Sequence, residues 1–337
     1  MQRKNHVLKT VLMIMLSLSS VSAAAQSFKT APHAPARNMI WTEKMESHIS
    51  FLSDTLCHGR GTGTQGGAEA AFWIARQFRD VGLIPLDRSW SQSFKTANGT
   101  TGHNIIGMVP GSLKKPSDKY IIIAAHYDHL GVLNGKAYPG ADANASGTAA
   151  VVLLAEMFTA MKSVGSTFGT NIIFAGLDAK EMDMAGSAAL WKSIREGRLT
   201  DPVTGRKITK DKITLMVNID QIGSSLSPIT KGREDYILIL GSQTLDAVRK
   251  NLLFSCNSTY DIGLDICLSY YGSRQFTDFF WKLSDQKIFA DNGIPSVMFT
   301  SGITMNNNKL RDKVSTLNMD VLRKRIYLIY HWVETML

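Results

Sequence analysis

Short apolar runs alternate along the chain with longer stretches in which apolar residues recur every three or four positions. The short runs have the length of strands and are bounded by Pro, Gly or polar residues, at 104–109, 119–125, 171–177, 213–219, 236–240 and 296–300. Because they are apolar throughout rather than alternating, they indicate strands of a sheet that is covered on both faces.

Helical periodicity fills the segments between these strands. It is present at 42–52, 184–194 and 245–254, and it gives three clear buried stripes: Ala71, Ile74, Ala75 and Phe78; Val151, Leu154, Ala155 and Phe158; Leu322, Ile326, Ile329 and Val333. Alternating strands and helices predict the α/β class, as a three-layer αβα sandwich around a central, mostly parallel mixed sheet. No repeat or linker divides residues 41–337, so we predict one domain there.

The first 40 residues differ from the rest. Arg3, Lys4 and Lys9 come before an apolar segment at 11–21, and three alanines at 23–25 fit a small-residue cleavage site. This pattern predicts a secretory signal peptide at 1–25, followed by an irregular Ala- and Pro-rich leader at 26–40. The apolar segment is too short to span a bilayer. We therefore expect an exported protein, periplasmic or extracellular, with no membrane span.

Charge and cysteine content limit the possible partners. Removal of the predicted signal peptide lowers the formal net charge from +9 to +6, and the remaining basic clusters at 195–212 and 323–325 are typical of solvated faces. No motif for nucleic-acid binding accompanies them, so no nucleic-acid partner is predicted. Of three cysteines, Cys256 and Cys267 are the more plausible disulfide pair in an exported protein, which leaves Cys57 as an odd thiol.

The candidate chemistry is concentrated between residues 120 and 147. An apolar run ends at His126, and sixteen residues later Asp142 opens a polar turn that leads into a helix. The carboxyl ends of strands in open α/β sheets are where sites form, and imidazole and carboxylate both bind zinc. Asp128 is placed to accept the second ring N–H of the histidine. The alternative is a buried histidine beside a solvated aspartate.

Three motifs carry a resemblance to a known family: Ala-His126-Tyr-Asp128-His-Leu-Gly, Gly-Ala-Asp142-Ala143-Asn-Ala-Ser-Gly and Asn-Ile-Asp220. In their order and spacing the sequence resembles peptidase family M28, the di-zinc aminopeptidases whose relatives include glutaminyl cyclases. The likeness runs from near residue 52 to the final helix. It implies a zinc-exopeptidase type of αβα fold, with two zinc ions about 3.5 Å apart that one aspartate bridges.

Carried over by position, the resemblance gives an incomplete set of zinc ligands. His126 and Asp220 match the two terminal ligands of one zinc ion, and Glu181 matches a ligand of the other. The bridging aspartate is Ala143 here, so the bridge is missing unless Asp142 turns inward. Asn308 stands where the family has a histidine, and an amide oxygen is a poor zinc ligand.

Lys180 stands where the family has its general base, a glutamate. An ammonium has no lone pair to accept a proton from water. Two further positions match residues behind the ligands. Gln286 replaces a histidine that many secreted members have, and Asp312 is expected to fix the loop around Asn308.

Charge counting connects these changes. Two carboxylates and one ammonium now occupy the ligand and base positions, so the site no longer needs divalent cations for neutrality. Our hypothesis is a site with at most one weakly held ion, at His126 and Asp220, or none, and with the Lys180 ammonium near Glu181. The alternative is that Lys180 points to solvent. His58 and His129 are possible replacement ligands, but their loop positions favour a surface role or a place behind the ligands.

Three functions follow from the resemblance. The first is an exported M28 relative that has lost catalysis and binds peptides or protein N-termini. The second is a working aminopeptidase that recruits other groups. The third, acyl transfer of the glutaminyl-cyclase type, draws on the same substituted positions. The resemblance also implies a cis bond between Ala143 and Asn144.

Overall fold

The computed structural model describes residues 42–112, 117–165 and 168–337. The predicted signal peptide and leader at 1–40 lie outside the described residues and stay predictions. The helices are α3 (Thr42–Ser53), α4 (Gln65–Asp80), α5 (Gly147–Ser163), α6 (Ala185–Arg195), α7 (Ala247–Thr259), α8 (Arg274–Trp281), α9 (Gln286–Asp291) and α10 (Met319–Glu334). The strands are β1 (Ile84–Pro85), β2 (Ser91–Lys95), β3 (Thr101–Val109), β4 (Tyr120–His126), β5 (Val132–Leu133), β6 (Lys136–Ala137), β7 (Asn171–Leu177), β8 (Ile213–Ile219), β9 (Tyr236–Leu240), β10 (Asp265–Cys267) and β11 (Ser296–Thr300).

One large mixed sheet forms the middle layer. Within the described ranges it has nine strands, of which eight follow the order β1-β3-β7-β4-β8-β11-β9-β10, and the ninth, β2, pairs with β3. The centre is parallel, because β7, β4, β8 and β11 pair in parallel with one another. Antiparallel pairs join β3 to β7 and β11 to β9.

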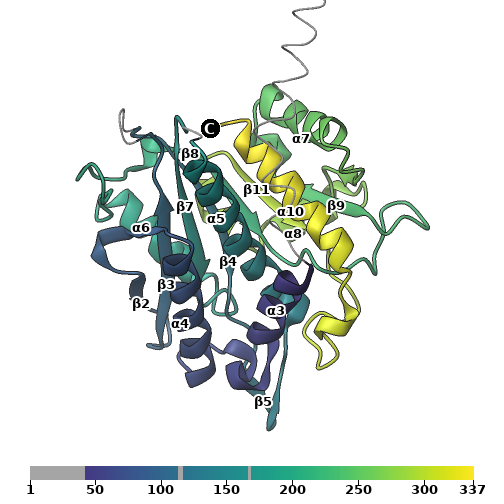
Figure 1. Ribbon diagram of the computed structural model, residues 1–337. Helices are drawn as coiled ribbons and strands as arrows, with labels where there is room; N and C mark the ends of the chain where they lie inside the picture. Colours follow the sequence, from purple (N-terminus) through teal and green to yellow (C-terminus); the bar gives the residue numbers. More distant parts are fainter. Residues whose placement is uncertain (1–41, 113–116, 166–167) are drawn as a thin grey trace, which may run out of the picture.

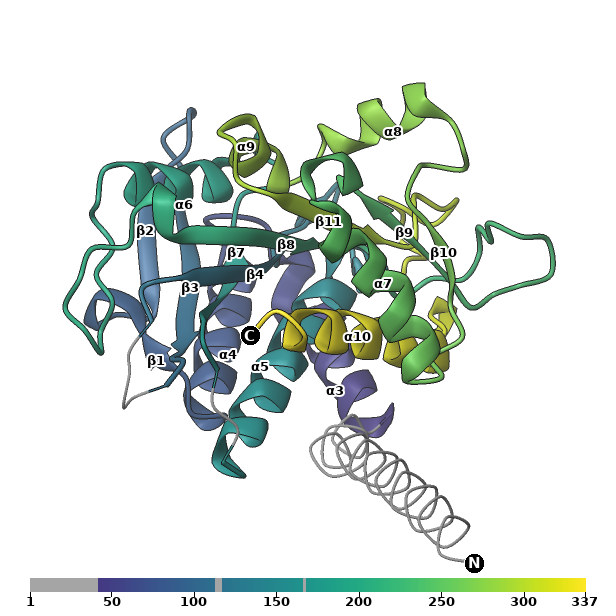
Figure 2. The ribbon, with the colours of Figure 1, turned by 90° about the horizontal axis from the view of Figure 1, so that it is seen from above.

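Helices cover both faces of this sheet, which confirms the predicted three-layer αβα architecture. Figure 2 shows α3, α4, α5, α7 and α10 on one side of the sheet and α6, α8 and α9 on the other. Successive residues of β4 divide between the two cores: Ile121 and Ile123 belong to the cluster under α5, whereas Ile122 and Ala124 belong to the cluster under α6. A strand with both faces buried is apolar along most of its length, as β4 is up to Ala125, before it ends at His126.

The predicted strands and most predicted helices are confirmed, with shifts of a few residues at their ends. The helix predicted at 245–254 instead begins at Ala247, after Asp246 caps it by accepting a hydrogen bond from the Arg249 amide, and it continues to Thr259. The expected disulfide is wrong. Cys256 and Cys267 are both free, and the Cys267 thiol donates to the carbonyl of Ser269.

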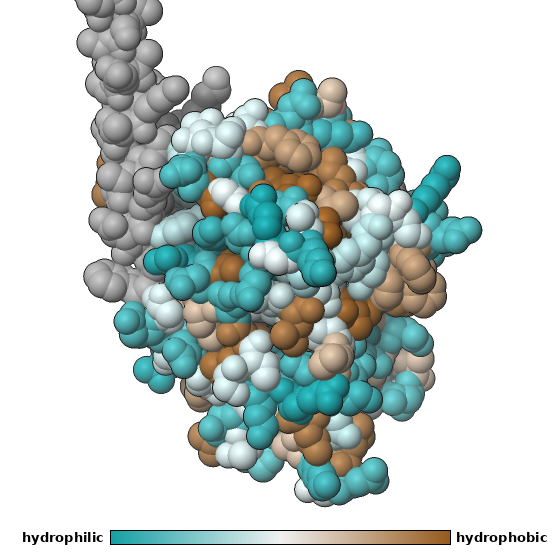
Figure 3. All heavy atoms as spheres, turned by 90° about the vertical axis from the view of Figure 1, so that its right-hand side faces the viewer, coloured by the Kyte–Doolittle hydropathy of each residue, from teal (hydrophilic) through white to brown (hydrophobic). Residues whose placement is uncertain are grey.

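Helix α5 lies in the middle of the larger core (Figure 1). The stretch Ala141–Ser163 passes a length and composition test for a membrane span, but 83% of its most apolar window is buried inside the protein. It is therefore a helix of the core. On the face that Figure 3 shows, brown side chains gather mainly in the upper part, at the end of the molecule where Figure 1 places α7. Val248 and Phe254 of α7 are exposed.

The parallel strands determine where the functional site forms. β4 ends at His126, β7 at Leu177 and β8 at Ile219, and the paired register brings these ends to one edge of the sheet. The chain segments that follow, with Lys180 and Asp220, therefore meet at the carboxyl edge.

A buried histidine on α3 gives a prediction for acid stability. His48 and Trp73 pack with their rings nearly perpendicular, 5.1 Å apart between ring centroids, and burial, with a smaller effect of Lys44, lowers the pKa of His48 to about 4. The folded state therefore resists protonation that the unfolded chain accepts near its ordinary value of about 6.5. Stability should be complete above about pH 6.5 and fall as the pH drops toward 4.

When the pH falls from 7 to 4.5, the unfolding free energy of the natural chain should decrease. That of the His48→Leu variant should decrease by on the order of 2 to 3 kcal/mol less. Urea unfolding at the two pH values measures this difference. Equal losses for the two proteins would contradict the assignment.

Candidate functional site

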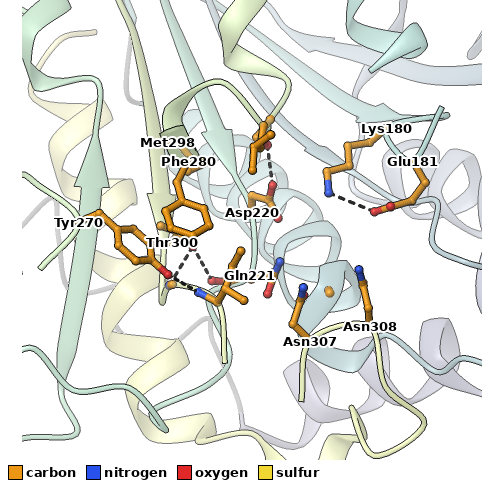
Figure 4. A pocket seen from close by; sticks show the side chains of 15 residues that line it. Lys180, Glu181, Asp220, Gln221, Tyr270, Phe280, Met298, Thr300, Asn307 and Asn308 are labelled. Carbon is orange, nitrogen blue, oxygen red and sulfur yellow. Dashed lines mark hydrogen bonds and ion pairs between the residues drawn. The ribbon is translucent and has the colours of Figure 1, made fainter. Parts of the chain in front are cut away.

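A cleft of about 780 Å³, including its open mouth, lies at the carboxyl edge of the sheet. It is charged on one side and apolar on the other, as Figure 4 shows. The lining residues include Ala143, Lys180, Glu181, Asp220, Gln221, Tyr270, Phe280, Leu283, Met298, Ile303, Asn307 and Asn308. The structure therefore brings together most of the residues that the resemblance singled out.

His126 is buried behind the cleft. Its Nδ1 lies 3.0 Å from the main-chain carbonyl of Asp128, and since a carbonyl only accepts, this nitrogen carries a proton. The Asp128 carboxylate is farther from Nδ1, at 3.6 Å, and accepts instead from the backbone amides of Lys180 and Glu181. Asp128 thus orients the histidine through its carbonyl rather than its carboxylate, and its carboxylate holds the loop after β7.

Asp220 faces His126 directly. Its Oδ1 lies 3.4 Å from His126 Nε2, and its Oδ2 accepts a hydrogen bond of 2.5 Å from Ser284. Burial alone would lower the pKa of His126, but Asp220 and Asp128 raise it to about 10. Burial would likewise raise the pKa of Asp220, but the imidazolium beside it holds that pKa well below its usual range. The two predicted zinc ligands therefore form an ion pair with each other.

Lys180 turns into the cleft rather than toward solvent. Its Nζ lies 3.1 Å from Glu181 Oε1, with side-chain exposures of 19% and 26% (Figure 4). Burial would lower the pKa of Lys180, but Asp220 and then Glu181 raise it above its ordinary value. The geometry agrees with the predicted position of the Lys180 ammonium beside the surviving acids.

Asp142 does not turn inward to replace the bridge. Its Oδ1 accepts hydrogen bonds from the Gly223 amide and from Ser146, and it does not line the cleft. Burial and then Asp312 raise the pKa of Asp142 to about 7. Ala143, at the bridging position, does line the cleft, and its bond to Asn144 is cis, as the resemblance implied.

Asp312 holds a different loop from the one that the sequence suggested. Its carboxylate accepts from the backbone amides of Asp142 and Ala143, so it holds that loop rather than the loop around Asn308. Asn308 lines the cleft in a left-handed conformation, with φ of 55°. Asn308 is an exposed residue.

Gln286 lies behind Asp220 in a buried hydrogen-bonded chain. The Asn218 amide donates to both Gln286 and Ser284 at 2.8 Å, and Ser284 donates to Asp220. Asn218 and Ser284 were missed by the sequence reasoning. They could have been identified from the sequence, because each lies two residues before a candidate site residue, Asp220 or Gln286.

The two candidate replacement ligands lie apart from the cleft. His58 is exposed, whereas His129 is buried with an exposure of 2%, so the expectation of a surface place holds for His58 only. Burial, with smaller effects of Arg60 and His126, lowers the pKa of His129 well below its usual range. Neither histidine is among the residues that line the cleft.

The side chains present do not fit a two-zinc centre. Among the residues that the structure describes, no three His, Cys, Asp or Glu side chains are grouped so that they could hold a metal ion. His126 is paired with Asp220 and Glu181 with Lys180, so the groups that would bind metal neutralise one another. The general-base position carries an ammonium, which has no lone pair to accept a proton, and the carboxylates of Glu181 and Asp220 are engaged in ion pairs.

Curated relatives with similar sequences come from fungi. The chain is 23% identical over 310 residues to leucine aminopeptidase 1 of Ajellomyces capsulatus, covering 88% of this chain and 73% of that protein. It is 24% identical over 182 residues to leucine aminopeptidase 1 of Blastomyces gilchristii, covering 53% of this chain and 45% of that protein. The match thus spans about half the length of some curated relatives.

Solved structures share the fold at lower identity. LapB from Legionella pneumophila superposes with a TM-score of 0.70 at 17% identity, covering 91% of this chain and 75% of that chain. A zinc aminopeptidase from Bacillus subtilis gives 0.64 at 14%, covering 88% and 95%. A glutaminyl cyclase from Macrostomum lignano gives 0.66 at 15%, covering 91% and 92%.

The sequence itself also matches a family model. The model described as peptidase family M28 matches residues 104–333, which is more than half of the chain and contains every cleft residue discussed above. The resemblance seen in the three motifs is thereby confirmed. This chain belongs to peptidase family M28.

Proposed function

We propose that this M28 protein keeps the cleft of a peptidase, has lost most or all catalysis, and binds peptides or protein N-termini. The observation that carries the proposal is the Lys180–Glu181 ion pair, with 3.1 Å between Nζ and Oε1. It puts an ammonium where the resemblance implies the general base. Loss of a positioned general base lowers a rate by about 10²- to 10⁴-fold.

The ligand positions support the same proposal. A methyl group at Ala143 and an amide at Asn308 stand at two ligand positions of the family's zinc centre. We propose that the protein holds at most one zinc ion, weakly, at His126 and Asp220, or none. The direct pairing of these two residues competes with any ion there.

Export belongs to this proposal as well. Its support is the charged, then apolar, then small-residue pattern of residues 1–25.

A working aminopeptidase is the second candidate, and the names of the fungal relatives favour it. It would need other groups to replace the base and the two substituted ligands. Acyl transfer of the glutaminyl-cyclase type is supported only by a shared fold.

We expect protein purified from the full-length chain to contain less than one zinc ion per molecule and to show no hydrolysis of leucine p-nitroanilide above background. The physical reason is that the base and two ligand positions carry groups that neither accept a proton nor bind zinc well. Elemental analysis and a colorimetric rate assay with added zinc measure the two quantities. Two tightly bound zinc ions together with rapid hydrolysis would disprove the proposed loss of catalysis.

A further inference from the structure

The polar side of the cleft offers a ligand both signs of charge. Lys180 and Glu181 are paired with each other, yet each side chain is still partly exposed to the cleft, at 19% and 26%. At the family's general-base position a cation replaces an anion. The cleft of this chain can therefore hold an anionic group beside a cationic one.

Two further acceptors face the same space. Asn307 Oδ1 is a buried atom without a hydrogen-bond partner among the described residues, and Asp220 Oδ1 makes no hydrogen bond there either, although it lies 3.4 Å from His126 Nε2 in the ion pair described above. Both residues line the cleft. A buried acceptor without a donor is unfavourable, so a ligand that brings donors to this place gains from satisfying it.

The opposite side of the cleft is apolar. Tyr270 and Phe280 stack with 4.1 Å between ring centroids, and Leu283, Met298 and Ile303 lie around the same space. Figure 4 shows Tyr270 and Phe280 across the cleft from Lys180 and Glu181, with Asp220 between them. A ligand that fits both sides has a charged head and an apolar body.

We propose that this cleft binds a free α-amino acid with an apolar side chain. The ligand carboxylate pairs with Lys180, the ligand ammonium pairs with Glu181 and Asp220, and the side chain lies against Tyr270 and Phe280. This inference rests on the loss of catalysis in the proposed function and goes beyond its binding role. Peptides and protein N-termini still bind in the cleft, but more weakly than a free amino acid.

The number of ion pairs that each ligand leaves in the cleft explains why a free amino acid should be preferred to a peptide N-terminus. A zwitterion replaces the Lys180–Glu181 pair with two new ion pairs, so no charge in the cleft is left without a partner. A peptide N-terminus has an ammonium but a neutral amide at the next position. It would draw Glu181 away from Lys180 and leave the ammonium of Lys180 unpaired, which lowers affinity.

Titration calorimetry with four ligands tests the preference at about pH 6.5, where α-amino groups are charged. L-Leucine should bind at least about 10-fold more tightly than L-leucinamide, which lacks the carboxylate, and than N-acetyl-L-leucine, which lacks the ammonium. Glycine has the same head without a side chain and should bind more weakly than L-leucine. Equal affinity for L-leucine and L-leucinamide, or no binding of L-leucine at 10 mM, would overturn the proposal.

Variants assign the two charges. Lys180→Gln should weaken L-leucine binding by at least about 10-fold and leave L-leucinamide binding unchanged or tighter, because Glu181 is then free. Glu181→Gln should weaken L-leucine and strengthen N-acetyl-L-leucine. Lys282→Gln removes the same charge from an exposed residue next to the cleft wall and should bind as the natural chain does. Unchanged L-leucine affinity in Lys180→Gln would refute the role of Lys180.

The two proposals fail in different measurements. Rapid hydrolysis of leucine p-nitroanilide would defeat the proposed function, whatever the order of binding affinities. A tighter complex with L-leucinamide than with L-leucine, in a protein without hydrolysis, would defeat only the amino-acid proposal. Thermal unfolding of each variant confirms that it is folded when its affinity is measured.

Discussion

The triple variant Lys180→Glu, Ala143→Asp, Asn308→His is expected to hydrolyse leucine p-nitroanilide at least about 100-fold faster than the natural chain. These three positions are those at which the sequence departs from the base and the zinc ligands that the family resemblance implies. The variant places a carboxylate, which can accept a proton, where an ammonium cannot. Initial rates with and without added zinc measure the gain.

The backbone already suits the restored side chains. Ala143 and Asn308 both line the cleft, so Asp and His at these positions start from backbone sites next to it. Asn308 has φ of 55°, a left-handed conformation in which His is enriched along with Asn and Asp. The substitutions therefore change side chains only and do not require the backbone to adopt a new conformation.

Zinc content should rise together with activity. In the variant, four carboxylates gather at the ligand and base positions without the Lys180 ammonium, and such a cluster is unfavourable without cations. Zinc should then raise the melting temperature of the variant more than that of the natural chain. Lys180→Glu alone, and the Ala143→Asp, Asn308→His pair alone, are the matched controls, and each should gain far less. A natural chain that is already as fast as the triple variant would disprove the argument.

Much of the fold could be predicted because its central strands are buried on both faces. β7, β8, β9 and β11 have the predicted bounds, since a run of apolar residues ends where the strand leaves the core. The missed elements lack this signal. β2 alternates between exposed and half-buried positions at the edge of the sheet. α8 is only eight residues long, and its Phe276 and Phe279 are exposed rather than packed in the core.

The site was predicted by position but not by contacts. The identity of Lys180, Ala143 and Asn308 could be read from the motifs. The direct pairing of His126 with Asp220 could not be predicted, because it depends on the distance between the ends of β4 and β8 in the folded sheet. The place of Asp312 was missed for the same reason, since its partners lie about 170 residues earlier in the chain.

The second large effect concerns stability and comes from Arg60, in the Gly-rich segment between α3 and α4. Arg60 is fully buried, and its guanidinium donates to four backbone carbonyls, those of Leu52, Tyr127, Pro139 and Gly140. Burial lowers the pKa of Arg60 to about 10, with a partial opposing effect of Cys57, so the group is still charged at neutral pH. It joins the end of α3 to the segments after β4 that carry the cleft.

The Arg60→Met variant is expected to lose at least about 3 kcal/mol of unfolding free energy. Methionine has a similar length, but it donates no hydrogen bonds, and four buried carbonyls lose their partner. Tyr127 and Gly140 adjoin His126 and the loop of Ala143, so the same variant should also weaken binding in the cleft. Urea unfolding followed by circular dichroism measures the stability change.

Arg79→Met is the matched control, because Arg79 lies on α4 with a side-chain exposure of 64% and forms an exposed ion pair with Asp80. Exposed pairs contribute little, so this variant should stay within about 0.5 kcal/mol of the natural chain. Arg60→Lys should fall between the two. Its ammonium keeps the charge but donates at most three hydrogen bonds from one atom, and the four carbonyls surround a planar fork. If Arg60→Met were as stable as Arg79→Met, the guanidinium would not be what holds these segments together.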